Sequence, residues 1–302
     1  MEVRSYVLPC PAGFDFHATA TVMRRGPADP LVWYDGRRWR RRLAVDGAEF
    51  LAEVSTIASS LQTRPRLSVR LLAGAVPRPA LARLVGRLFG LDDPAGALSH
   101  RLRGSIRCTL AGVRRTAALP GYPSLFEAAV HVILGQQISA TAANAHRAAF
   151  TKRFGRPFAF QDGTYWMFPS PRDVAGERLA SLRRPGLSTA KAVAVRAAAR
   201  AFAGGAISEA GLERMRAEAA IETLTVLPGI GRWTAEWVLL RGLRRFDVVP
   251  AGDLAIRKAV TWHAGHAALL SEPQVRELAA AWTPYAGLVA FRLLLAHRQT
   301  VG

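Results

Sequence analysis

Cysteine is scarce in this chain of 302 residues, which has only Cys10 and Cys108. Two cysteines are too few for a disulfide framework, and they exclude an iron–sulfur cluster or a zinc site built wholly from cysteine. No apolar run reaches membrane-spanning length without charges, and the first residues lack the apolar core of a signal peptide. We therefore expect a cytoplasmic protein with no Fe–S cluster and no membrane partner.

Acidic residues and lysines are also few, whereas arginine is abundant. Lys and Arg together number 41 against 22 Asp and Glu, which gives a formal net charge of +19. The only lysines are Lys152, Lys191 and Lys258. Such an excess of positive charge indicates nucleic acid or an acidic membrane surface as the partner, although a basic bias of a whole proteome would give the same balance. Half of the residues are apolar, which suits a large folded core, and a length of 302 residues predicts two or three packed units.

The first part of the chain is expected to form a small antiparallel sheet with one or two helices. Alternation of apolar with small or polar residues predicts strands at Phe16–Met23, Leu31–Tyr34, Trp39–Leu43 and Arg64–Leu72. The Asp35-Gly36 pair between the second and third of these predicts a hairpin. The segment Gly47–Leu61 is predicted to be a helix.

After Pro77 the apolar residues recur at helical spacing, and Gly and Pro clusters separate the segments. The predicted helices are Ala80–Leu91, Leu125–Phe154, Ala190–Ala203, Leu212–Val226, Arg232–Leu243, Leu254–His263, Glu272–Trp282 and Ala286–His297. The fold class is therefore α+β, with a small antiparallel-sheet N-terminal domain at residues 1–76 followed by a two-lobed all-α core. We expect one lobe to comprise residues 77–120 and 246–302, and the other to comprise residues 121–245.

The most informative segment is Thr223–Val238, TLTVLPGIGRWTAEWV. A short helix is expected to run into Leu227–Gly231, and a second helix follows at once. We expect Gly229 and Gly231 to adopt positive φ and to approach a ligand closely. The free N–H groups that begin the second helix form a ready anion site, and a phosphate diester fits it. By itself, however, the turn is equally typical of an ordinary helix–helix connection.

The residues that follow make the pattern specific. Phe246–Asp253, FDVVPAGD, comes after the second helix, and the whole arrangement resembles the helix-hairpin-helix, Gly/Pro-rich-loop, Asp superfamily of DNA glycosylases. Other segments in matching order are FEAAVHVILGQQIS (126–139), FPSP (168–171), GLS (186–188) before Lys191-Ala192, and WTPY (282–285). Over residues 120–295 their order is similar to that of the 3-methyladenine DNA glycosylase II family.

This resemblance implies a helix-hairpin-helix glycosylase core and a function in base excision repair. The enzyme would bind double-stranded DNA that contains damaged bases, flip an alkylated base out of the duplex and hydrolyse its glycosidic bond to leave an abasic site. It would act as a monomer associated with the nucleoid and require no cofactor. A glycosylase for oxidised or deaminated bases, and a damage-binding protein without activity, are the alternatives.

The resemblance places Asp253 at the catalytic position, where a fixed carboxylate stabilises the positive charge that develops on the sugar. Asp253 also stands where an N-cap residue would, and it could serve both purposes. Trp233 occupies the position of the nucleophilic lysine of lyase members, so a monofunctional hydrolytic route follows. Trp237 lies one turn later on the same helix face. The two indoles could line a pocket for cationic bases such as 3-methyladenine and 7-methylguanine, or they could be core residues.

Several further residues acquire expected roles from the same resemblance. Gln137 stands where the family inserts a residue into the gap left by the flipped nucleotide, although Gln136 or Gln137 could instead cap or bridge helices. The hairpin residues expected to contact DNA are Gly229, Gly231 and Thr234. The backbone carbonyls that resemble those holding a monovalent cation in the family belong to Thr225, Leu227 and Ile230.

Two regions depart from the family or lie outside the match. Leu254 and Leu294 stand where the best-known members carry pocket aromatics, and Ala286 stands where an Arg often follows the WTPY motif. The pocket is therefore expected to be wider or less aromatic. The run Arg37–Arg42 suits a DNA-binding patch and a solvated hairpin equally well.

Overall fold

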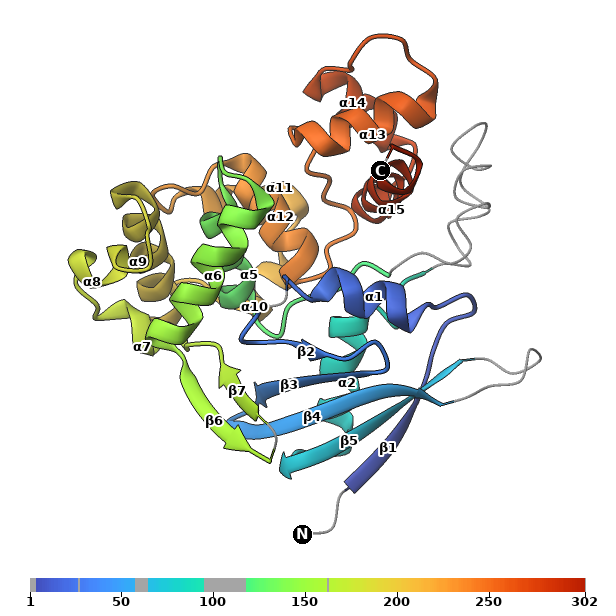
Figure 1. Cartoon of the computed structure of the whole chain (residues 1–302). Helices are drawn as coiled ribbons and strands as arrows, with labels where there is room; N and C mark the ends of the chain where they lie inside the picture. Colours follow the sequence, from blue (N-terminus) through green and yellow to red (C-terminus); the bar gives the residue numbers. More distant parts are fainter. Residues whose placement is uncertain (1–3, 27, 58–64, 95–117, 162, 302) are drawn as a thin grey trace.

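The computed structural model describes residues 4–26, 28–57, 65–94, 118–161 and 163–301, which leaves Cys108 outside the described part (Figure 1). The N-terminal part forms a five-stranded antiparallel sheet of order β1-β5-β4-β3-β2. Its strands are β1 (Arg4–Pro9), β2 (Trp33–Tyr34), β3 (Arg38–Val45), β4 (Ala48–Ile57) and β5 (Arg66–Gly74). The predicted hairpin at Asp35-Gly36 is confirmed by the β2–β3 pairing.

Helices make up most of the remainder, which confirms the α+β class. Those before the hairpin region are α1 (Phe16–Met23), α2 (Arg78–Phe89), α5 (Leu125–Gly135), α6 (Ala140–Phe154), α7 (Pro171–Ala175), α8 (Leu179–Arg183) and α9 (Thr189–Ala203). The later ones are α10 (Glu209–Arg214), α11 (Ala217–Thr225), α12 (Arg232–Gly242), α13 (Leu254–Ala264), α14 (Glu272–Ala280) and α15 (Ala286–Val301). None of the described helices is both long and apolar enough to cross a membrane.

The strand predicted at Phe16–Met23 is wrong, because these residues form helix α1. Its buried residues lie at helical spacing: Phe16, Thr19, Ala20 and Met23. Asp15 caps the helix by accepting a hydrogen bond from the N–H of Ala18 at 2.9 Å. The apparent alternation within FHATATVM is therefore incidental, and the cap together with the buried stripe decides the structure.

The helix predicted at Gly47–Leu61 is also wrong, because its described residues contain strand β4. This strand pairs with β3 on one side and β5 on the other. The run Phe50–Val54 is buried throughout, so it lacks the alternation by which a half-buried strand is found in a sequence.

Two predicted helices are interrupted, and one hairpin was not predicted. The single helix expected at Leu125–Phe154 divides into α5 and α6, because Gln137 has a φ of 55° and Ser139 starts a new helix by capping Ala142. The helix expected at Leu212–Val226 divides into α10 and α11, because Met215 and Arg216 have extended backbone between the two helices. The hairpin that was not predicted follows α6 and consists of β6 (Arg156–Phe160) and β7 (Gly163–Met167).

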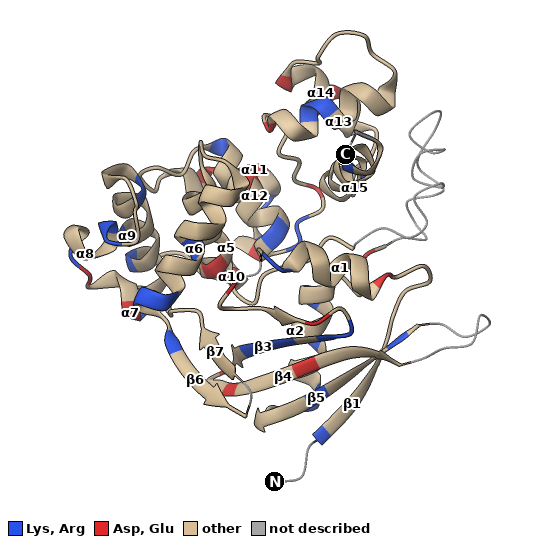
Figure 2. Ribbon diagram, viewed as in Figure 1, with Lys and Arg blue, Asp and Glu red and all other residues tan. Residues whose placement is uncertain are grey.

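The arginine run of β3 holds the sheet to the helical part of the molecule, so neither interpretation of Arg37–Arg42 is correct for its central residues. Figure 2 shows β3 as the most strongly basic strand of the sheet. Buried Arg41 reaches Glu127 of α5 at 2.6 Å. On the opposite face, Arg40 donates to the hydroxyl of Tyr165 at 3.0 Å and Arg42 lies 4.0 Å from the ring of Phe158, both on the β6–β7 hairpin.

Two hydrophobic clusters form the interior. The larger runs from Leu8 to Val248 and includes the sheet, α2, α5, α9 and much of α12. The smaller is formed by α13, α14 and α15 with Leu119 and Leu240. Phe89 of α2 contacts Trp39 of the sheet with ring centroids 5.1 Å apart. Helix α12 thus lies between the clusters, and the catalytic residues proposed from the sequence are found at this junction.

Candidate active site

Asp253 is the residue that begins helix α13. Its Oδ1 atom accepts hydrogen bonds from the N–H groups of Ala255 at 2.9 Å and Ile256 at 3.2 Å. The capping role expected from the sequence is therefore confirmed. Because the positive end of a helix favours a negative charge, the same arrangement stabilises the carboxylate in place.

The other oxygen of Asp253 faces helix α12. Its Oδ2 atom accepts hydrogen bonds from the indole N–H of Trp233 at 2.9 Å and from that of Trp237 at 3.1 Å. Four N–H groups thus converge on one carboxylate, and these charge-assisted hydrogen bonds fix its orientation. Sequence reasoning placed the three residues together, but it missed that both indoles donate to the carboxylate.

The tryptophans combine features of both interpretations offered for them. Each ring is partly buried and packs against the larger hydrophobic cluster, and Trp237 also packs against the smaller one. Their polar edges, however, point to Asp253 rather than into the core. Leu254, which follows Asp253, is 52% exposed, whereas Leu294 and Ala286 are buried.

The hairpin joins α11 to α12 as the sequence indicates. Gly229 has a φ of 77°, and a Cβ atom there would lie 2.7 Å from the Cβ of Ala194 on α9. Only glycine satisfies both conditions. The expectation of positive φ at Gly231 is wrong: its φ is −84°, and an added Cβ would meet no described atom within 4 Å. Gly231 therefore does not serve a strained backbone conformation; its missing side chain leaves the N-terminus of α12 accessible.

The first turn of α12 offers N–H groups to an anion. The first intrahelical bond runs from the N–H of Ala235 to the carbonyl of Gly231 at 3.0 Å, so the N–H groups of the preceding helical residues point out of the helix end. The hydroxyl of Thr234, by contrast, is buried and accepts a hydrogen bond from Gln136 at 2.8 Å. Any contact of Thr234 with a phosphate would therefore use its backbone.

Gln136 and Gln137 have different positions at the end of α5. The amide of Gln136 also donates to the carbonyl of Gly229 at 2.9 Å, so the bridging role considered for it is confirmed. Gln137 is exposed, with its backbone in the left-handed region. Gln136 thereby fixes the end of α5, where Gln137 follows, against the hairpin.

The carbonyls considered for a monovalent cation lie along the hairpin turn. That of Leu227 accepts the N–H of Ile230 at 3.1 Å, and the side chain of Thr225 donates to the carbonyl of Glu222 at 2.9 Å. Carbonyl oxygens are the ligands that hard cations prefer, so the donor type suits such an ion.

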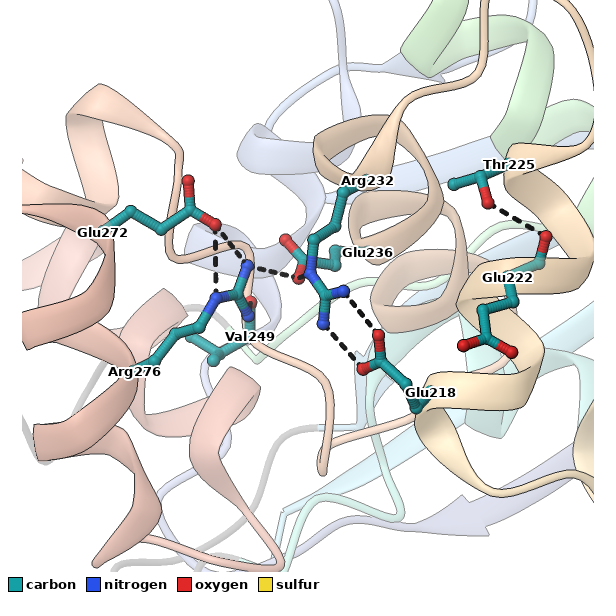
Figure 3. A network of polar contacts seen from close by, with 8 residues as sticks. All are labelled: Glu218, Glu222, Thr225, Arg232, Glu236, Val249, Glu272 and Arg276. Atoms are coloured by element: carbon teal, nitrogen blue, oxygen red, sulfur yellow. Dashed lines mark hydrogen bonds and ion pairs between the residues drawn. The ribbon is translucent and has the colours of Figure 1, made fainter.

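A chain of ion pairs connects the hairpin to the smaller cluster (Figure 3). Arg232 at the start of α12 pairs with Glu218 of α11 at 2.5 Å and with Glu236 at 3.1 Å. Arg276 of α14 pairs with Glu236 at 2.7 Å and with Glu272 at 2.6 Å. Figure 3 shows the two arginines approaching Glu236 from opposite sides.

Glu236 is the centre of this chain. It is 1% exposed, and burial raises the pKa of its carboxyl while Arg276 and Arg232 oppose that rise. A Cβ added to Gly252, the residue before Asp253, would lie 2.8 Å from a carboxylate oxygen of Glu272. The bridge therefore lies directly against the loop that leads into Asp253.

This bridge was not predicted from the sequence. Two of its pairs, Arg232 with Glu236 and Glu272 with Arg276, have the i, i+4 spacing of helical ion pairs, and this was the available signal. The pair that joins the lobes, Glu236 with Arg276, is separated by 40 positions, and no local pattern reveals it.

Comparison with known proteins fits this geometry. The sequence model of the HhH-GPD superfamily, described as base excision DNA repair proteins, matches residues 130–284, a range that includes the hairpin and Asp253. The chain belongs to this superfamily. The matched range begins within α5 and ends in the WTPY motif.

Individual relatives carry a more specific name. The chain is 28% identical to the DNA-3-methyladenine glycosylase of Bacillus subtilis (strain 168), over 95% of each chain. It is also 28% identical to DNA-3-methyladenine glycosylase 2 of Escherichia coli (strain K12), over 84% of this chain and 92% of that protein. The structure of a 3-methyladenine DNA-glycosylase from Archaeoglobus fulgidus has the same fold, with a TM-score of 0.80, 23% identity and coverage of 97% and 98% of the two chains.

Proposed function

We propose that this protein is a monofunctional DNA glycosylase that removes alkylated bases from double-stranded DNA and leaves an abasic site. The observation that carries this proposal is the carboxylate of Asp253, which is fixed by four N–H donors that include the indoles of Trp233 and Trp237. Membership of a base excision repair superfamily and relatives named for 3-methyladenine support the same conclusion.

Asp253 stabilises the positive charge that appears on the sugar as the glycosidic bond breaks. In this reaction the bond between C1′ and the base nitrogen breaks with its electron pair leaving on the base, and water supplies the new oxygen at C1′. Because the carboxylate is already oriented by its donors, little reorganisation is needed as the charge develops. Trp233 offers an indole N–H where a lysine nucleophile would stand, so no covalent adduct forms at this position.

Alkylated bases suit this site for two reasons. Bases such as 3-methyladenine and 7-methylguanine carry positive charge, and an electron-rich indole attracts a stacked cation. They are also good leaving groups, so one carboxylate is a sufficient catalyst. Exposed Leu254 in place of an aromatic makes the site less aromatic, which favours a broad set of alkylated bases.

The hairpin and the tip of α5 would bind the DNA. The N–H groups at the start of α12 would contact a phosphate beside Gly229 and Gly231, and carbonyls of the turn would hold a monovalent cation. Exposed Gln137 would occupy the gap left by the flipped nucleotide. The net charge of +19 adds long-range electrostatic attraction to the DNA.

Analysis of the bases released from damaged DNA tests this proposal. Purified protein is incubated with methylated duplex DNA and, in parallel, with duplexes that contain hypoxanthine or 8-oxoguanine, and the released bases are identified by mass spectrometry. We expect 3-methyladenine and 7-methylguanine to be released, with strand breaks only after alkali treatment and no adduct trapped by borohydride.

Two results would contradict the proposal in different ways. Release of oxidised or deaminated bases alone would show a different substrate class. A borohydride-trapped adduct would overturn the monofunctional route and would point to Lys258 on α13 or to the terminal amine as the nucleophile.

A further inference from the structure

Buried polar side chains surround two small cavities where the N-terminal part of the chain meets α5, α6 and α12. The cavities have volumes of about 20 Å³ and about 10 Å³, and they share Arg25, Asp29, Leu31 and His131 in their walls. The larger is also lined by Arg41, Tyr122, Glu127 and Arg241. A volume of 20 Å³ accommodates one guest the size of a water molecule or a small ion.

Three buried side chains on these walls have polar atoms without a hydrogen-bond partner in the described part of the chain. These atoms are Nε of Arg41, both ring nitrogens of His131, and Oγ1 of Thr151. The three residues are 5%, 2% and 0% exposed, respectively. The arginine N–H can only donate, and folded proteins rarely leave buried donors unmatched. The unmatched donors therefore indicate an acceptor that is not part of the protein.

Positive charge exceeds negative charge on the cavity walls among the described residues. The guanidinium groups are those of Arg25, Arg41, Arg147 and Arg241, and the carboxylates are those of Asp29 and Glu127. Asp29 faces both cavities, but its two oxygens accept the N–H groups of Arg25 and Leu31, each at 3.0 Å. Both carboxylate oxygens of Glu127 accept hydrogen bonds from Arg41.

The remaining guanidinium groups bind neutral acceptors. Arg147 donates to the carbonyl of His131 at 2.7 Å, and Arg241 donates to that of Pro120 at 2.6 Å. Arg25 donates to the hydroxyl of Tyr122. These oxygens satisfy the geometry of the arginines, whereas the charge of the guanidinium groups is offset only in part by Asp29 and Glu127.

The pKa shifts of the buried groups agree with this excess of charge. Burial, reinforced by Arg25 and Arg147, lowers the pKa of His131 well below its usual value. Its imidazole is therefore neutral and keeps one N–H available. Burial and the neighbouring Arg25 also lower the pKa of Arg147 to about 10.

We propose that the larger cavity binds one monovalent anion of the size of chloride, held by Nε of Arg41, the N–H of His131 and the guanidinium groups of Arg25 and Arg241. A halide accepts from all of these donors and neutralises part of their charge. Phosphate and sulfate are too large for this volume. The anion connects the N-terminal part of the chain with α5 and α12, so it stabilises this junction.

Anomalous scattering from bromide tests the proposal without any substitution. Crystals of the full chain are grown in chloride-free buffer and soaked in sodium bromide, and the anomalous difference map is calculated. We expect a bromide peak inside the cavity beside His131 and Arg41. Water density in the cavity, with bromide confined to the protein surface, would overturn the proposal.

Thermal unfolding gives an independent test in solution. The Tm is measured in sodium chloride and in sodium gluconate at equal ionic strength. We expect chloride to raise the Tm of the wild type saturably, by about 3 °C for a chain of this size.

Variants separate a specific site from a general salt effect. His131→Phe keeps the ring contacts with Tyr122 and Phe168, whose centroids each lie 5.2 Å away, but removes the N–H. We expect it to lose the chloride-dependent shift, whereas Arg153→Gln on the exposed face of α6 keeps it. An equal chloride shift in wild type and His131→Phe would show that no specific site exists.

Discussion

Trp237 makes two contributions at Asp253, and its hydrogen bond can be removed without its ring. Its ring packs between the two hydrophobic clusters, and its N–H donates to Oδ2 of Asp253 at 3.1 Å. Trp237→Phe keeps an aromatic ring and loses the donor, whereas Trp237→Ala loses both. The two variants therefore distinguish the effect of packing from the effect on the carboxylate.

We expect Trp237→Phe to keep a Tm near that of the wild type. It should lower the rate of 3-methyladenine release by about tenfold to a hundredfold, which corresponds to the loss of one charge-assisted hydrogen bond. Trp237→Ala should in addition lower the free energy of unfolding by about 3 kcal/mol. Melting curves and single-turnover excision rates measure both. A Phe variant with the wild-type rate would show that the indole donor has no part in the reaction.

At the scale of elements, the two hairpin glycines have different roles and predict different outcomes. Gly229→Ala places a methyl group 2.7 Å from Ala194 at a φ of 77°, so we expect both the Tm and the DNA affinity to fall. Gly231→Ala meets no described atom and leaves φ in an ordinary region. We expect it to keep the Tm and to weaken binding roughly tenfold for every sequence, because it obstructs phosphate approach.

Binding of several unrelated duplexes by fluorescence anisotropy, with melting curves, checks this prediction. Full affinity in Gly231→Ala would mean that the start of α12 does not contact the backbone of DNA. A change in preference among the duplexes would mean that the hairpin reads sequence.

The bridge between α12 and α14 is expected to hold the loop before Asp253. Arg276→Gln leaves buried Glu236 with Arg232 alone, so we expect a loss of about 2 kcal/mol in the free energy of unfolding and slower base release. Glu236→Gln combined with Arg276→Gln should recover part of that stability. A double-mutant cycle by urea unfolding measures the coupling, with exposed Arg298→Gln as the control. Additive effects would show that the pair does not join the two lobes.

The sequence predicted the elements that carry specific motifs better than those that depend on long-range packing. The hairpin between α11 and α12 was predicted because glycine chemistry and helical spacing are local properties, whereas Asp253 and the two tryptophans were singled out through the resemblance to the glycosylase superfamily. Strand β4 was missed because its middle, Phe50–Val54, is buried throughout and so lacks the alternation of a half-buried strand. Helix α1 was missed because its short sequence fits two periods, and the cap at Asp15 together with the buried stripe decides between them. The ion pair of Glu236 with Arg276 depends on tertiary structure alone.

At the scale of the whole molecule, the hydrophobic clusters define the expected units of unfolding. The larger cluster runs without interruption from the sheet into α12, and Arg41 with Glu127 ties the two parts. The boundary after residue 76 expected from the sequence does not coincide with a break in this cluster. We therefore expect the sheet and α5–α12 to unfold together, and α13–α15 to unfold separately.

Hydrogen exchange followed by mass spectrometry in increasing urea measures this directly. Peptides from β3–β5 and from α5 should lose protection at the same urea concentration, and peptides from α13 and α15 should differ from them. Loss of protection in the sheet alone would establish an independent N-terminal domain.

The central claim is that the fixed carboxylate of Asp253 drives base release, and comparison of Asp253→Asn with the wild type tests it most directly. Asparagine caps a helix as well as aspartate does, so the fold and DNA affinity should be kept. Single-turnover release of 3-methyladenine should fall by about a hundredfold or more, because the negative charge is lost. The exposed Asp247→Asn variant should react at the wild-type rate. An Asp253→Asn enzyme that binds DNA normally and releases the base at nearly the wild-type rate would contradict the account.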